Sequence, residues 1–361
     1  MRLRLEARAH PARIMLWLSP VLAAVLSVIG VCLLFAVLGR DPLQALQILF
    51  IAPLASIDGL AELALKATPL LLCAIGIAIG CRADVWNIGA EGQFTLGAIC
   101  GAVVALRFGG SDAWWLIPAE LLAGIAGGAA WAAIPALLKT RFNAHEILTT
   151  LMLTYVALQL LSYVVHGPLQ DPQGYSFPQS KQFEADAMLP MLIPDTRLHI
   201  GALFALASVP LGSLLLGRTL MGFRIRVVGL APGAARYAGF DRNGIVWFCL
   251  LLSGGLAGLA GICEVAGPDG QLTPVISPGY GFAAIIVAFL GRLNPVGILF
   301  ASLLLALLYL GGEGLQLSMQ LPIAVTGTVQ GMLLFFLLGA DVFINYRVRL
   351  RPAHGGAASH A

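Results

Sequence analysis

The residues best placed for chemistry lie in a polar, glycine-rich stretch that interrupts an apolar run between Gly80 and Phe94. This stretch carries one carboxylate and two amides, namely Glu91, Asn87 and Gln93. Such groups are costly beside lipid, and they persist there only when they are buried in protein or line a wet path. We therefore expect this break to be a functional site within a membrane domain.

Carboxylates in other apolar runs raise the possibility of proton coupling. Glu62 and Lys66 lie four residues apart, so on a helix they share a face and can pair. Glu264 lies near the outer end of its apolar run. A proton-coupled carrier needs ionisable groups deep in the bilayer, and the candidates that we identify are Glu62, Glu91 and Glu264.

The patterns of soluble enzymes and of ATP-binding proteins are missing from the sequence. None of the lysines follows a glycine, so there is no GxxxxGK[ST] loop, and there is no HExxH or GxSxG pattern. The cysteines lie in or beside apolar runs without CxxC spacing, and the histidines lie at the ends of these runs or in the tails. We therefore expect a chain that is not an enzyme, with no catalytic residue, no metal site and no nucleic-acid partner.

The composition identifies lipid as the main solvent of this chain. Of 361 residues, 59% are hydrophobic and 11% are charged, whereas soluble domains carry about 25% charged residues. The first apolar run follows a basic N-terminus but is too long for a signal peptide, so we expect it to be retained. A helix needs about 20 apolar residues to cross a bilayer. We predict an all-α, polytopic bundle of about ten spans, at 14–38, 60–80, 93–107, 114–138, 147–166, 199–217, 244–266, 279–291, 296–312 and 321–340.

Charge predicts the orientation of this bundle. Lys and Arg concentrate in both tails and in the segment 218–243, whereas the proline-rich segment 167–198 is acidic. By the positive-inside rule the basic segments are cytoplasmic and 167–198 is external. Both termini are then cytoplasmic and the number of spans is even: ten, or eight if the short runs pair as re-entrant hairpins. We expect one transmembrane domain over 14–345 between cytoplasmic tails at 1–13 and 346–361.

Helix interruptions recur in the two halves of the chain. The zone 80–107 resembles the zone 267–312, where Gly-Pro-Asp-Gly and Pro-Gly-Tyr-Gly break the apolar pattern. Paired interrupted segments are typical of an inverted repeat around a central pathway. GxxxG pairs predict close helix packing nearby, at Gly76/Gly80, Gly97/Gly101, Gly124/Gly128 and Gly254/Gly258.

The segment 218–243 is the most unusual stretch that faces the cytoplasm. Pro232 can open a short helix that ends at Gly239 and presents small side chains, those of Ala234, Ala235 and Ala238. Such a helix suits docking into a groove on a partner. Its flanking arginines equally suit anchoring to anionic lipid, and the residues alone leave both interpretations open.

A second local signal is a predicted helix start at residues 143–146. Asn143 can act as the N-cap, and Glu146 follows three residues later, as in a capping box. This structural role is sufficient to explain both residues.

Five segments in a fixed order resemble a known family. They are "DVWNIGAEGQFTLGA", "EILTTLMLTYVALQLLSYVVHGPLQDPQGYSFPQS", "GFRIRVVGLAPGAARYAGF", "LSGGLAGLAGICEVAG" and "GYGFAAIIVAFLGRLNPVGILFASLLLALL". Together they are similar to the inner-membrane permease of bacterial ABC importers for nucleosides and simple sugars, over most of residues 60–345. The sequence departs at Thr154, where many relatives have Asn, and we assign no role to that position.

The resemblance implies a type II ABC importer-like permease subunit in the bacterial plasma (inner) membrane, which moves a nucleoside or simple sugar by alternating access. A separate cytoplasmic ATPase would bind ATP and Mg, so this chain would need no cofactor. A second, homologous permease would complete a heterodimer, and a periplasmic or lipid-anchored binding protein would capture the solute. The alternatives are a secondary carrier or channel that works without an ATPase, and a structural membrane subunit without a pathway.

The resemblance also implies roles for particular residues. The loop 218–243 would couple the permease to the ATPase through Gly222, Arg226, Gly229, Ala234, Ala235 and Gly239. The two breaks would line the translocation path, with Asn87, Glu91, Gln93, Tyr280 and Phe282 as candidates. For Glu91 we favour a structural role near the path over contact with the solute.

Overall fold

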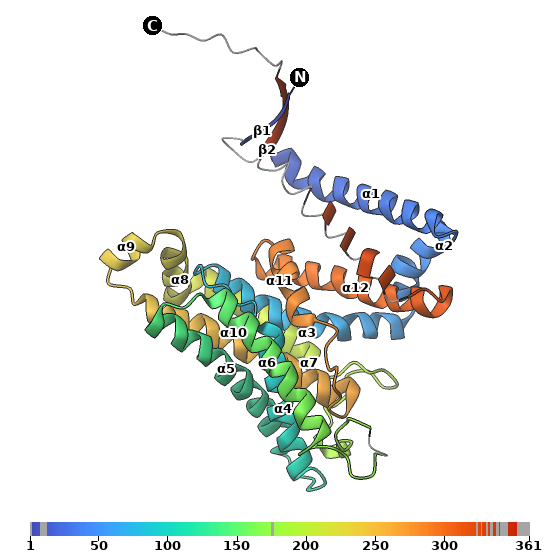
Figure 1. Ribbon diagram of the computed structural model, residues 1–361, viewed down its shortest axis with the longest axis vertical. Coiled ribbons are helices and arrows are strands. Elements are labelled where there is room, and N and C mark those ends of the chain that lie inside the picture. Colours follow the sequence, from blue (N-terminus) through green and yellow to red (C-terminus); the bar gives the residue numbers. More distant parts are fainter. Residues whose placement is uncertain are drawn as a thin grey trace. The chain divides into compact units, whose positions relative to one another are not determined.

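The computed structural model describes residues 2–7, 13–174, 177–322 and 346–351, together with 324–325, 327–329, 331–332, 335–336 and 339. The chain forms two units, Pro53–Leu310 and Met1–Ala52 with Gly311–Ala361. The predicted all-α class is confirmed (Figure 1). The helices are α1 (Arg13–Val37), α2 (Pro42–Leu46), α3 (Ile57–Cys81), α4 (Ala90–Phe108), α5 (Leu116–Phe142), α6 (Glu146–His166), α7 (Gly201–Arg218), α8 (Leu220–Leu230), α9 (Pro232–Tyr237), α10 (Arg242–Glu264), α11 (Tyr280–Leu290) and α12 (Pro295–Met319).

Short elements complete this order. The helical turns are η1 (Gln47–Ile51), η2 (Ala52–Leu54), η3 (Ala185–Ala187) and η4 (Val265–Asp269). Two strands, β1 (Arg2–Ala7) and β2 (Tyr346–Arg351), pair antiparallel. We predicted these two segments only as tails, and the terminal ribbon is an addition to the predicted fold.

Six helices in the described part of the chain are long and apolar enough to cross a membrane. They are Ile57–Cys81, Leu116–Phe142, Glu146–His166, Gly201–Arg218, Arg242–Asp269 and Pro295–Met319. The predicted run 296–312 was therefore too short, because α12 continues to Met319. Within it, the missing side chain of Gly311 lets the helix lie against the backbone of Leu49. The predicted span 321–340 lies partly outside the described residues, and the number of spans stays a prediction.

Glycine contacts hold the centre of the Pro53–Leu310 unit together. Helices α4 and α10 lie against each other and against α5 (Figure 1). A Cβ atom at Gly97 would overlap the backbone of Gly258, and one at Gly128 would overlap the carbonyl group of Gly254. Backbones can approach this closely only where both side chains are missing, so the predicted GxxxG packing is confirmed at these pairs.

The segment 167–198 is folded onto the second break. The amide of Ser180 donates to the carbonyl of Leu272 at 2.8 Å, and that of Phe183 donates to Gly270 at 2.7 Å. Farther along, the amide of Leu189 donates to the carbonyl oxygen of a residue in η4 at 2.9 Å. The connection between α6 and α7 therefore covers the connection between α10 and α11.

The predicted helix start at residues 143–146 was placed wrongly. Asn143 is the left-handed C-cap of α5 (φ 53°), and α6 begins at Glu146 after His145 at the N-cap position. Asparagine tolerates the left-handed conformation that ends many helices, so the same residue type suits both roles. Glu146 instead forms an ion pair with Lys139 from the last turn of α5.

Candidate functional site: a buried junction of two broken helices

The first break is tied to the turn between α11 and α12. Nε and Nη2 of Arg82 donate to the carbonyl oxygen of Leu293 at 3.0 and 2.8 Å. Trp86 stacks on Phe289, with ring centroids 5.5 Å apart and ring planes 20° apart. Residues from both halves of the chain therefore hold the backbone between α3 and α4.

The two amides of the break form a closed hydrogen-bond network with α10. Nδ2 of Asn87 donates to Oε1 of Gln93 at 2.7 Å and to the hydroxyl of Ser253 at 2.9 Å. Oδ1 of Asn87 accepts from Nε2 of Gln93 and from the amide of Gly89, both at 3.1 Å. All these side chains are buried. Because buried polar groups stabilise a fold only when they are paired, the network fixes the start of α4 against α10.

The carboxylate of the break caps the helix that follows the second break. Oε2 of Glu91 accepts a hydrogen bond from the amide of Gly281 at 2.6 Å. Gly281 has no room for a side chain, because a Cβ atom there would overlap the backbone of Glu91. The first turns of α4 and α11 therefore meet at this point, and the carboxylate lies where the free amides of helix N-termini favour a negative charge.

Aromatic rings close one side of this junction. Tyr280 is 2% exposed and packs edge-on against Tyr309, with centroids 5.8 Å apart, and beside Phe94 at 6.4 Å. Phe282 is 37% exposed, and its backbone amide hydrogen-bonds to the Glu91 carboxylate beside that of Gly281. The structure thus brings together the buried side chains of Asn87, Glu91, Gln93 and Tyr280, and Phe282 joins them through its backbone while its side chain is partly exposed. Their lining of a path stays a prediction.

Sequence reasoning missed three residues of interest. Ser253 and Gly281 complete the junction, but they are distant in the sequence from the groups that they bind. The third is Glu120 in α5, which our set of membrane carboxylates omitted. It is fully buried, and neither carboxyl oxygen has a hydrogen-bond partner among the described residues. A lone carboxylate inside an apolar run is the signal that could have identified it.

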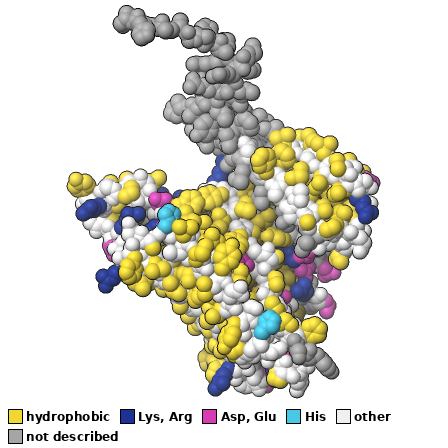
Figure 2. All heavy atoms as spheres, viewed as in Figure 1, with side chains coloured by type: hydrophobic (Ala, Val, Ile, Leu, Met, Phe, Trp, Pro, Cys, Tyr) yellow, Lys and Arg dark blue, Asp and Glu magenta, His cyan; other side chains and the backbone are white. Residues whose placement is uncertain are grey.

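The predicted helix in the loop 218–243 is confirmed. Helix α9 starts at Pro232 and is followed by Gly239 in a left-handed conformation (φ 73°). Lys and Arg side chains gather at the end of the molecule that carries α8 and α9, whereas hydrophobic side chains cover much of the helical body (Figure 2). Tyr237, the last residue of α9, is 98% exposed. Helix α9 therefore lies open to a partner.

The six coupling candidates divide into two groups. Gly222 and Gly229 are packing positions, since a Cβ atom would overlap the carbonyl oxygen of Leu215 in the first case and of Arg82 in the second. Buried or half-buried side chains in the loop are those of Ala235 and Arg226, whereas Ala234 and Gly239 are exposed. Of the six candidates, only Ala234 and Gly239 therefore lie on the free surface of the loop.

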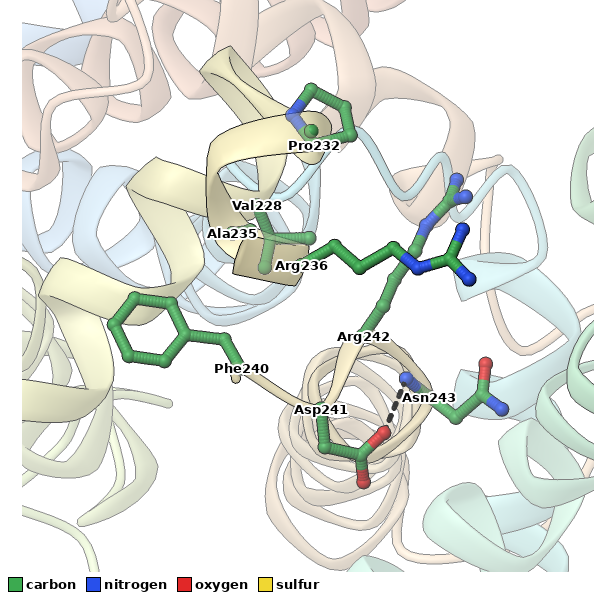
Figure 3. Close-up of a pocket in the computed structure, with 9 residues that line it drawn as sticks. Val228, Pro232, Ala235, Arg236, Phe240, Asp241, Arg242 and Asn243 are labelled. Atoms are coloured by element: carbon green, nitrogen blue, oxygen red, sulfur yellow. Dashed lines mark hydrogen bonds between the residues drawn. The ribbon is translucent and has the colours of Figure 1, made fainter. Parts of the chain in front are cut away.

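A hollow of about 620 Å³ lies between α9 and the start of α10. Its wall includes Arg236 and Arg242, whose side chains extend toward the same space in Figure 3. Oδ1 of Asp241 accepts from the amide of Asn243 at 3.0 Å, so this carboxylate caps α10. The hollow therefore presents two arginines beside an apolar floor formed by Val228 and Ala235. The described residues contain no cluster that could hold a metal ion.

A family model described as "Branched-chain amino acid transport system / permease component" matches residues 59–338. The chain belongs to this permease family. The glucose ABC transporter permease protein TsgB13 of Haloferax volcanii is 38% identical to it, over 96% of this chain and 94% of its own. The guanosine ABC transporter permease protein NupP of Bacillus subtilis and the nucleoside ABC transporter permease protein NupB of Lactococcus lactis subsp. cremoris are each 29% identical over 89% of this chain, and over 92% and 90% of their own.

These relatives confirm the resemblance to ABC transporter permeases. The protein is a permease subunit of an ABC transporter and a multi-pass membrane protein. Membership of this permease family implies association with an ATPase and with a substrate-binding protein.

Proposed function

We propose that this permease forms the pathway for a nucleoside or simple sugar and switches between outward-facing and inward-facing states. ATP and Mg are bound by a separate ATPase, and this chain performs no chemistry. The permease lies in the plasma (inner) membrane with both termini cytoplasmic, where a second homologous permease completes a heterodimer. The binding protein docks on the side of the segment 167–198. Relatives named for glucose, guanosine and nucleosides support the solute class.

The observation that carries the proposal is a direct contact between the basic loop and the first break. Gly229 of α8 lies against the carbonyl of Arg82. Arg82 in turn binds the carbonyl oxygen of Leu293, between α11 and α12. Burial and the nearby Arg226 lower the pKa of Arg82, so two guanidinium groups lie close together at this contact. A displacement of α8 therefore acts on both broken segments at once.

The free surface of α9 is the part of the loop on which the ATPase would act. The ATPase would seat a segment against α9, and the arginines of the hollow favour an acidic segment. Movement of that segment on ATP binding would pass through α8 to Arg82. From there the backbone leads within a few residues to the junction of Asn87 and Glu91. Coupling in this form needs a rigid loop, and the packed glycines Gly222 and Gly229 provide the rigidity.

The experiment is a charge substitution on the exposed end of α9, Tyr237→Glu, in the assembled complex in proteoliposomes. We expect ATP-driven uptake to fall by about tenfold or more, which corresponds to about 1.4 kcal/mol of lost coupling. The substitution leaves the fold intact because Tyr237 is 98% exposed. Gly229→Glu is a poorer probe, because its side chain would collide with the carbonyl of Arg82.

Tyr237→Phe is the matched control, since it keeps the ring and adds no charge, and it should transport like the wild type. The isolated permease should hydrolyse no ATP. Uptake by Tyr237→Glu at the wild-type rate would remove α9 from the mechanism. Uptake by the permease alone without ATP would replace an ATP-driven importer with a secondary carrier or channel.

A further inference from the structure

The packing of helix α6 fixes which of its sides is buried. Its buried residues recur every three or four positions and pack against α4. Gly89 lies against Thr150, and a Cβ atom at Gly92 would come within 2.8 Å of Cα of Thr154. Thr154 is therefore a packing residue with no exposed surface, and its hydroxyl donates to the carbonyl of Thr150 at 3.2 Å. Contacts this close leave the opposite side of α6 uncovered.

The uncovered side of α6 carries a polar stripe over its second half, next to the exposed apolar side chains of Val156, Leu158 and Leu160. Tyr155 is 57% exposed, Tyr163 is 67% exposed, and Gln159 lies exposed between them. The three side chains follow each other at four-residue intervals, so they form one stripe about 12 Å long. None of them has a side-chain hydrogen bond to any other described residue. The first half of this side is apolar, with Leu148 and Met152 exposed.

The neighbouring spans show what a side that faces lipid looks like in this protein. In α5 the exposed stripe up to the last turn is apolar, formed by Pro118, Leu122, Ala126, Ala130, Ile134 and Leu137. In α7 it is again apolar, formed by Leu203, Leu206, Ala207, Pro210, Leu211 and Leu214. An unpaired amide in hydrocarbon costs about 2–7 kcal/mol. The amide of Gln159 therefore belongs in a different environment from the exposed residues of α5 and α7.

We propose that Tyr155, Gln159 and Tyr163 line the solute path and bind an uncharged, ring-bearing solute there. The inference rests on the proposed function and identifies the surface that performs it. Tyrosine rings stack on flat bases and on the apolar faces of sugars, and a glutamine amide can donate and accept hydrogen bonds to hydroxyl groups or base edges. Sites of this kind combine aromatic walls with a few directed polar groups.

The absence of charged residues from this face favours some classes of solute over others. Helix α6 contains no Asp, Glu, Lys or Arg between Ile147 and Val165. An amino acid carries both an ammonium and a carboxylate, and burying these charges without partners is far more costly than burying hydroxyl groups. A neutral nucleoside or sugar therefore fits this face, and an amino-acid zwitterion does not.

The buried junction does not compete for this role in the conformation described. The amides of Asn87 and Gln93 bind each other and Ser253, and Glu91 binds the amide of Gly281. Their hydrogen-bonding groups are occupied and enclosed. The groups of α6 are open, and they lie in the part of the helix that leads to the segment 167–198, where the binding protein would release the solute.

The test is cysteine labelling with a membrane-impermeant thiol reagent in the assembled transporter. Gln159→Cys and Tyr163→Cys are compared with Leu122→Cys, whose side chain is 65% exposed on the apolar stripe of α5. Labelling above that of the wild-type chain, which already has six cysteines, is the signal. We expect both α6 positions to be labelled, Leu122→Cys to stay unlabelled, and a transported solute, guanosine or glucose, to slow labelling by at least about tenfold.

Transport kinetics supply a second measurement. Gln159→Leu should raise the KM for uptake by about tenfold or more without lowering the thermal midpoint of the purified complex, and Gln159→Asn should restore part of the affinity. Labelling of Gln159→Cys no faster than that of Leu122→Cys would assign this face to lipid. Labelling that appears only when the second permease is absent would assign it to a subunit contact. Either result overturns the inference.

Uptake by the wild-type complex, measured in the same vesicles, separates the two hypotheses. A complex that transports guanosine or glucose while α6 stays unlabelled or unprotected refutes the role of α6 alone. A complex that transports neither solute refutes the proposed function, and with it the solute class inferred from this face.

Discussion

The buried junction and the open face of α6 use the same kinds of side chain in opposite ways. At the junction, Asn87 and Gln93 are 2% and 1% exposed, and each binds a partner within the protein. On α6, Gln159 is exposed and has no hydrogen-bond partner among the described residues. A buried polar group that is hydrogen-bonded within the protein contributes to folding stability. An exposed polar group without such a partner can instead form hydrogen bonds with a molecule beside the helix. Substitutions should therefore separate stability from transport.

The largest effect that we expect concerns another buried polar group, His199, which is 2% exposed. Its Nδ1 accepts from the amide of Gly201 at 3.1 Å, and burial lowers its pKa from 6.5 to about 4. The folded protein keeps the imidazole neutral, while the unfolded chain binds a proton below about pH 6.5. The contribution of His199 to stability is therefore fully present above about pH 6.5 and is lost as the pH drops to about 4, by about 3 kcal/mol at about 1.4 kcal/mol per unit of pKa.

Thermal unfolding of the purified protein between pH 7.5 and pH 4 measures this effect. The midpoint of His199→Gln should fall less than that of the wild type over this range. His166→Gln, at the exposed end of α6, is the matched control and should keep the wild-type decline. An unchanged pH profile in His199→Gln would show that the decline has another origin.

A smaller effect comes from a matched pair of glutamines. Gln93→Leu removes two hydrogen bonds from the buried Asn87, which should lower the free energy of unfolding by about 1–3 kcal/mol. Gln159→Leu removes an exposed amide without a partner in the chain and should leave stability unchanged. Thermal midpoints and uptake, measured on both variants, compare the two regions directly. A stability loss of the same size in Gln159→Leu would mean that its amide also has a partner in the folded protein.

The sequence predicts the position of the junction but not its contacts. An interrupted apolar run is enough to find the break before α4, because polar residues in a membrane segment stand out. Its partners Ser253 and Gly281 lie 166 and 190 residues away from the groups that they bind. No local pattern identifies such pairs, because only the packing of α4 on α10 and α11 brings them together.

The open face of α6 could not be found from the sequence for a different reason. Thr150, Thr154, Tyr155 and Gln159 are all polar, and periodicity alone does not tell which side of the helix is covered. The close approach of Gly92 to Thr154 decides it, and that contact is between separate helices. Helix α9, in contrast, follows from local rules, with Pro232 at its first position and Gly239 just after its end.

Substitution of Glu120 has the smallest expected effect on stability, and its sign is opposite to that of Gln93→Leu. Its side chain is as fully buried as the junction, yet neither carboxyl oxygen has a hydrogen-bond partner in the part of the chain that the structure describes. A buried carboxyl group without such a partner costs free energy in either protonation state. Glu120→Leu, which is close in volume, should therefore leave stability unchanged or raise it by about 1 kcal/mol, whereas Gln93→Leu lowers it.

Thermal midpoints of Glu120→Leu and of Glu120→Gln measure this effect. The amide variant, which is still polar and unpaired, should show no gain. A loss of more than about 2 kcal/mol in Glu120→Leu would place this carboxyl group among the paired residues, since removing one partner of a buried interaction carries a cost of that size.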